Sequence, residues 1–204
     1  MELELTQQAL VWVVVIAASV LRSFTGFGFA LAGVPFLAFF LPPAQVVVLI
    51  ASLSVALGVQ TFPQYASKLQ VKPEWPLLLA AVVGTVLGAL ILQFLSEDLF
   101  RLALGILVIG ASLILSRYHP HHFEPGAGVR ASAGLSSGLM NGAFAIPGPP
   151  IVIYVMATQT DPARARASMI AFFSFSSAVA LINYAAAGLV SLSSLWLFLL
   201  AYPA

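Results

Sequence analysis

The sequence of 204 residues contains no cysteine, which excludes disulfides, thiolate metal sites and cysteine nucleophiles. Charged residues are scarce as well: they make up 7% of the chain, whereas soluble domains carry roughly 25%. The formal net charge is +1, so nothing in the charge balance suggests a nucleic-acid partner. The chain is instead apolar, with 61% hydrophobic residues, more than a soluble domain of this size can hide in one core.

Long and nearly uncharged apolar runs account for this composition. They occupy residues 9–24, 44–65, 75–95, 98–116, 129–141, 163–187 and 192–204. Most of them reach or approach the roughly 20 residues that a helix needs to cross a bilayer. Because the runs show little alternation of apolar and polar residues, helices are favoured over a β-barrel. The sequence predicts an all-α integral membrane protein, a polytopic helical bundle forming one transmembrane domain over residues 1–204.

The positions of lysine and arginine predict how the chain is oriented. With the N-terminus outside, six of the eight basic residues fall on the cytoplasmic side: Lys68, Lys72, Arg117, Arg130, Arg164 and Arg166. Cytoplasmic loops of membrane proteins are enriched in such residues. We therefore expect a periplasmic N-terminus. Residues 1–8 are acidic and lack the basic start of a cleavable signal peptide, so the first run is expected to be retained.

Two stretches of the sequence resemble each other at a constant shift of 115 residues, so that position 26 corresponds to position 141. Residues 26–40 read GFGFALAGVPFLAFF, and residues 141–155 read NGAFAIPGPPIVIYV. Since each copy holds an odd number of segments, the second would be inverted, as in many secondary transporters. We expect repeat one at about 9–116, a cytoplasmic loop at about 117–128 and repeat two at about 129–204. Chance similarity between apolar, glycine-rich segments is the alternative.

Repeat two is shorter than repeat one when the two are aligned. Lys72-Pro-Glu-Trp75 corresponds to Ser193-Ser-Leu-Trp196, and the first copy continues for two more runs beyond its tryptophan. We therefore expect that the natural chain continues past Ala204 or that the last two spans are absent.

The glycines and prolines of both motifs predict broken or re-entrant helices inside the membrane. The interrupting glycines are Gly26, Gly28, Gly33, Gly142 and Gly148. Proline favours the first turn of a helix, so Pro35 and Pro150 predict short helices that begin near residues 34 and 149. Their free amides and positive dipole ends suit an anion. The alternative is that these glycines only allow close helix packing.

Arg22 lies within the first apolar run, where a charge is costly, and a guanidinium binds oxyanions through paired hydrogen bonds. The alternative is an arginine that extends to the membrane surface. The predicted anion-binding residues are Arg22, Thr25, Gly26, Phe27, Gly28, Asn141, Gly142, Gly148, Ser174 and Asn183. Further polar candidates in the same spans are Ser52, Ser54, Gln60, Ser168, Ser176 and Ser177. For any one of these polar side chains, a hydrogen bond within or between helices is the alternative.

No catalytic residue, metal or cofactor is expected. Residues 134–138 read GLSSG, which matches the nucleophile-elbow pattern. Such a serine needs an adjacent base, but the three histidines, His119, His121 and His122, all lie in one loop. The cluster has no acidic or thiolate framework around it, so an interfacial loop is expected there and not a metal site. No carboxylate lies deep in a span, which leaves a coupling ion unassigned.

The chain resembles the TauE/SafE family of sulfite and organosulfonate transporters at residues 25–35, TGFGFALAGVP, and 142–150, GAFAIPGPP. The resemblance implies a bacterial inner-membrane transporter that moves a small sulfur-containing anion by alternating access, and within the family a sulfonate permease. Arg22 and Asn141 depart from the family pattern, which indicates a substrate other than sulfite. A membrane scaffold and a passive anion channel are the alternatives. The expected partners are the anion, the lipid bilayer and, in a homodimer, a second copy of the chain.

Overall fold

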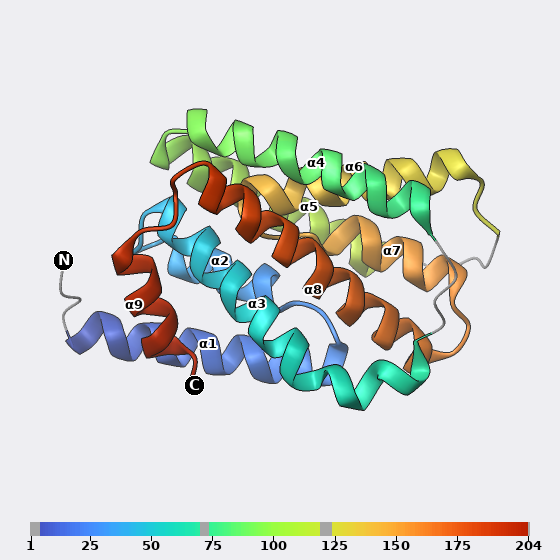
Figure 1. The fold of residues 1–204 in the computed structure, drawn as a ribbon, viewed down its shortest axis with the longest axis horizontal. Helices are drawn as coiled ribbons and strands as arrows, with labels where there is room; N and C mark the ends of the chain where they lie inside the picture. The colour runs from blue at the N-terminus through green and yellow to red at the C-terminus, as the bar shows by residue number, and fades with distance from the viewer. Residues whose placement is uncertain (1–4, 70–73, 119–123, 204) are drawn as a thin grey trace.

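The computed structural model describes residues 5–69, 74–118 and 124–203. These residues form helices and no strand: α1 (Leu5–Thr25), α2 (Phe29–Leu37), α3 (Pro43–Tyr65), the 3-10 turn η1 (Ala66–Lys68), α4 (Trp75–Phe94), α5 (Glu97–Arg117), α6 (Ala127–Phe144), α7 (Gly148–Thr158), α8 (Pro162–Ala186) and α9 (Leu192–Ala201) (Figure 1). The predicted all-α fold is confirmed. Lys72 and the histidines at 119, 121 and 122 lie outside the described residues.

Five stretches of this bundle are long and apolar enough to cross a membrane. They are Thr6–Thr25, Pro43–Lys68, Trp75–Phe94, Glu97–Arg117 and Pro162–Ala186. Large apolar side chains cover their outer surface; Phe94 is 88% exposed and Ile182 is 70% exposed. Because so much apolar surface is stable only in contact with lipid, the chain is a multi-pass membrane protein.

The long helices lie side by side along the longest axis of the molecule (Figure 1). The two short helices α2 and α7 follow α1 and α6 directly and pack against them. From the middle of the bundle, α2 runs towards the end at which α1 begins, and α7 runs towards the opposite end (Figure 1). Each motif thus holds a broken helix, as predicted. The inverted symmetry of two repeats stays a prediction.

Closely spaced glycines bring α4 and α6 together. A Cβ atom built on Gly138 would lie 2.2 Å from the carbonyl oxygen of Ala81, and one built on Gly88 would lie 2.3 Å from that of Leu139. The same holds for Gly84, Gly134 and Gly142. Such contacts leave no room for a side chain, and they are typical of membrane helices that associate through small residues. The two parallel helices therefore form the most tightly packed part of the bundle.

The start of α2 differs from the prediction. This helix begins at Phe29 instead of near residue 34, and Pro35 lies inside it. Gly26 and Gly28 have φ angles of +79° and +92°, which are accessible to glycine at little cost. These two residues, and not the proline, therefore reverse the chain. In the second motif α7 begins at Gly148, close to the predicted position, with Pro149 in its first turn.

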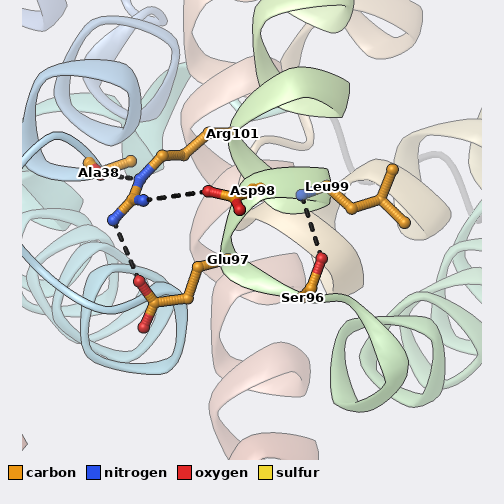
Figure 2. A network of polar contacts seen from close by, with 6 residues as sticks. All are labelled: Ala38, Ser96, Glu97, Asp98, Leu99 and Arg101. Carbon is orange, nitrogen blue, oxygen red and sulfur yellow. Dashed lines mark hydrogen bonds and ion pairs between the residues drawn. The ribbon is translucent and has the colours of Figure 1, made fainter.

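Polar contacts hold the outer ends of both short helices. Beyond the C-terminus of α2, Ala38 accepts a hydrogen bond of 2.9 Å from Nε of Arg101 in α5 (Figure 2). Glu97 and Asp98 lie 3.1 Å and 3.8 Å from the same guanidinium. At the other end of the molecule, the hydroxyl of Tyr154 in α7 donates to Glu74, which precedes α4. Each short helix is thus attached to a neighbouring long helix at its outer end.

Candidate functional site

The first break is a polar turn between α1 and α2. Thr25 closes it: its hydroxyl lies 2.8 Å from the carbonyl oxygen of Leu21 and 2.5 Å from that of Phe27, and it accepts a hydrogen bond of 3.2 Å from the Phe27 amide. Gly26 faces α8, where the guanidinium of Arg166 donates to the carbonyl oxygen of Ser23. A Cβ on Gly26 would lie 2.5 Å from Cγ of Arg166. Thr25 and Gly26 therefore shape the break.

The second break, between α6 and α7, has its backbone groups paired by buried side chains. Ala145 adopts φ +55°, which is uncommon for a residue with a Cβ. The hydroxyl of Tyr184 lies 2.9 Å from the carbonyl oxygens of both Asn141 and Gly142. Ser137 donates to the carbonyl oxygen of Pro147 at 2.5 Å. These contacts bond backbone carbonyl groups at the end of α6 and in the turn that follows it.

Both breaks line the same cavity, whose empty space amounts to about 440 Å³ when the open solvent at its mouth is counted. Residues 27–31 form one wall and residues 146–149 form another, while Ser54 of α3 and Ser177 of α8 add a hydroxyl each. The remaining wall is apolar and includes Phe173 and Leu115. A cavity between broken helices is a common form of substrate site in secondary transporters.

Arg22 is the only charged residue among the described residues that line this cavity. Its side chain is buried, with 7% of the residue exposed, so it does not extend to the membrane surface. Its Nη2 nitrogen has no hydrogen-bond partner among the residues that the structure describes. A buried cation without a partner is costly, and an anion in the cavity would relieve that cost.

The start of α2 provides backbone donors beside Arg22. Phe29, Ala30 and Leu31 form its first turn and all line the cavity. First-turn amides have no partner inside their own helix, and no bond from these three to another described residue is present. In α7 the first turn contains Pro149 and Pro150, which have no N–H. The amide donors are therefore concentrated at the first break.

Ser54 and Ser177 are also placed to donate to a ligand. They are 5% and 3% exposed, and neither hydroxyl is hydrogen-bonded to another group of the described chain. Ser52 and Ser174 differ, because they donate to the carbonyl oxygens of Val48 and Ile170 one turn earlier. Sequence position alone does not distinguish these serines, since all four lie on apolar helices.

The cavity brings together only part of the predicted anion-binding set. Arg22, Phe27, Gly28 and Gly148 line it. Thr25, Gly26, Asn141, Gly142, Ser174 and Asn183 are not among its lining residues. Asn183 donates to the carbonyl oxygen of Val179, and Gly142 packs against the backbone of α4. Anion binding by any member of the set stays a prediction.

Asn141 lies behind the second break, fully buried. Its amide nitrogen donates to the carbonyl oxygen of Ser176 at 2.7 Å and lies 3.5 Å from the hydroxyl of Thr85. Its position links α6 to α8 and α4. The visible role of Asn141 is thus to join three helices.

Comparison with known proteins identifies relatives along most of the chain. The family model described as "Sulfite exporter TauE/SafE" matches residues 11–204. A protein of Cupriavidus necator named "Probable sulfite/organosulfonate exporter TauE" is 27% identical over 173 residues, which cover 80% of this chain and 66% of that relative. The chain thus spans a little less than two thirds of that relative. No solved structure matches. The extent of the family match shows that the chain belongs to the TauE/SafE family, whose members are transporters and not enzymes.

Proposed function

We propose that the protein transports a small sulfur-containing anion, a sulfonate or sulfite, across the bacterial inner membrane by alternating access. The observation that carries this proposal is the buried guanidinium of Arg22 in a cavity between two broken helices, where its Nη2 has no hydrogen-bond partner among the described residues. Sulfur oxyanions offer several oxygen acceptors, and Arg22 faces them together with the hydroxyls of Ser54 and Ser177. Family membership supports the same class of substrate.

The positions of the short helices support alternating access. Both α2 and α7 begin at the cavity, and they run towards opposite ends of the bundle (Figure 1). Movement of one short helix would therefore open a path on one side while the other stays closed. A scaffold without a transported ligand has no use for a buried cation of this kind, so the cavity favours a transporter. An open channel would need a continuous pore, and saturation of flux with substrate concentration separates the two.

The charges at the two ends of the bundle support the proposed orientation in the membrane. Five of the seven basic residues that the structure describes belong to helix ends that meet at one end, opposite to the start of α1 (Figure 1): Lys68, Arg117, Arg130, Arg164 and Arg166. The positive-inside rule supports assigning that end to the cytoplasm, and we therefore propose a periplasmic N-terminus. The homodimer expected from the sequence stays a prediction.

The test is transport by the purified protein in liposomes, with Arg22→Gln compared with Arg164→Gln. Arg164 is a matched control because it is half-exposed and lies 3.4 Å from Asp161 at the surface. We expect Arg22→Gln to reduce transport of a sulfonate at least about tenfold, since a charge-assisted hydrogen bond to a buried group is lost. Arg164→Gln is expected to transport normally. Equal transport by both folded variants would exclude Arg22 from the site.

A further inference from the structure

The charge of the cavity comes from a single described side chain. Arg22 supplies one positive charge, and neither a carboxylate nor a second cation occurs among the described residues that line the cavity. Arg166 approaches the first break from α8, but its guanidinium is already bonded to the carbonyl oxygen of Ser23, and the residue is exposed. The net side-chain charge that faces a bound ligand is therefore +1.

The helix ends do not add appreciably to this charge. At the first break the negative end of α1, at Thr25, meets the positive end of α2, at Phe29. At the second break the end of α6 meets the start of α7 in the same way. Each helix end is equivalent to about half an elementary charge of opposite sign, so the two ends at each break largely offset each other. The amides of α2 remain as donors, but the guanidinium dominates the field.

We infer that the site selects monovalent oxyanions over divalent ones of the same shape, a selectivity that rests on the transport function proposed above. One negative charge neutralises Arg22 and leaves the cavity without net charge. A second negative charge would enter a space walled by residues such as Phe29, Leu115 and Phe173, with no cation left to pair with it. A buried charge without a partner is strongly unfavourable.

The test is a pair of ligands that share their shape and differ in charge. Methanesulfonate and sulfate are both tetrahedral, and they differ by a methyl group in place of one charged oxygen. Their dissociation constants for the purified full chain in detergent are measured by calorimetry at constant ionic strength. We expect methanesulfonate to bind at least about tenfold more tightly than sulfate, because sulfate leaves one charge uncompensated. Arg22→Gln is expected to abolish binding of both ligands.

A second variant tests the reason for this preference. Leu115→Lys places a second cation on the cavity wall, and it is expected to tighten sulfate binding relative to methanesulfonate at least about tenfold. Ser116→Lys is the matched control, since Ser116 is exposed and does not line the cavity. The control is expected to keep the wild-type preference. If Leu115→Lys does not fold, the wild-type pair of ligands alone decides.

The outcomes separate the selectivity from the transport function. If methanesulfonate binds more tightly than sulfate and this binding depends on Arg22, both the selectivity and the transport function are supported. Equal or tighter binding of sulfate that depends on Arg22 overturns the selectivity and leaves an anion site in place. Failure of both ligands and of sulfite to bind, or binding that survives Arg22→Gln, overturns the transport proposal together with the selectivity.

Discussion

The two helix breaks meet at one cavity, yet they are built from different groups. The first has two glycines with positive φ, the buried cation Arg22 and the free amides that begin α2. The second has prolines in place of amide donors, and buried side chains such as Tyr184 already bond its carbonyl groups. We interpret the first break as the side that binds the anion and the second as the rigid support. The contrast predicts that substitutions at the second break change stability, whereas those at the first change binding.

The largest expected effect on stability comes from the packing behind the second break. Gly138→Ala would place a methyl group 2.2 Å from the carbonyl oxygen of Ala81 and force α4 and α6 apart. We expect a loss of about 1–3 kcal/mol in the free energy of unfolding, as for other overpacked interiors. The measurement is the unfolding midpoint of the purified protein in detergent with increasing denaturant.

The control for this substitution is another helical glycine. Gly110 lies in α5, and apart from the neighbouring backbone of its own helix no atom of the described residues lies within 4 Å of its ideal Cβ position. Gly110→Ala is therefore expected to keep or slightly raise stability, since alanine favours a helix by up to about 1 kcal/mol over glycine. A similar loss in both variants would show that the tight approach of α4 and α6 does not carry the stability assigned to it.

A pair of equivalent substitutions compares the breaks directly. Gly28 has φ +92°, and a Cβ there would lie 3.2 Å from Cδ2 of Leu21. An alanine in this region of backbone conformation costs roughly 1–2 kcal/mol, so Gly28→Ala is expected to displace the start of α2 and weaken anion binding. Gly148 also lines the cavity, but a Cβ there would meet no described atom within 4 Å, so Gly148→Ala is expected to weaken binding much less than Gly28→Ala. Calorimetric titration with methanesulfonate measures both. Equal weakening would contradict the assignment of binding to the first break.

Tyr184→Phe tests whether the second break acts as a rigid support. Tyr184 is not among the residues that line the cavity. Its hydroxyl is fully buried and reaches two carbonyl oxygens at the end of α6. Since Asn141 keeps a backbone bond from the amide of Ala145, we expect a loss of only about 1 kcal/mol, the usual net value of one hydrogen bond. Unfolding in denaturant measures the loss, and the dissociation constant for the anion is expected to be unchanged. A weaker anion affinity in a stable variant would mean that the second break also shapes the site.

The sequence was sufficient to predict the helical membrane fold, because several uncharged apolar runs of spanning length rarely occur together outside membrane proteins. It also located both breaks, since Gly26, Gly28 and Gly148 fall where the helices are interrupted. It did not locate the start of α2. Pro35 is a strong local signal for a helix start, but positive φ angles at Gly26 and Gly28 had already turned the chain before it, and α2 begins at Phe29.

The composition of the candidate site was harder to predict for a physical reason. Gly142 and Gly148 belong to the same motif, but one packs against α4 and the other lines the cavity. Ser54 and Ser52 are both polar residues in one apolar helix, and only Ser54 faces the cavity. Which face of a helix meets which neighbour depends on contacts between distant segments. Arg22 was recognisable from the sequence, because few positions inside a membrane accommodate a charged side chain without a large cost in free energy.

The smallest expected effect concerns the outer end of α2. Arg101 donates from Nε to the carbonyl oxygen of Ala38 at 2.9 Å (Figure 2). Its guanidinium is partly exposed and shared with Glu97 and Asp98, so solvent screens much of the interaction. We expect Arg101→Ala to cost about 0.5–1 kcal/mol of stability, the usual scale of such a bond. This contact lies at the outer end of α2, far from the cavity, so the affinity for the anion in detergent is expected to stay unchanged. The rate of transport in liposomes is expected to change, because the outer end of α2 is no longer held. Arg101→Lys keeps the charge without the Nε donor and serves as the control. If it transports like the wild type, the charge and not the bond to Ala38 holds the end of α2.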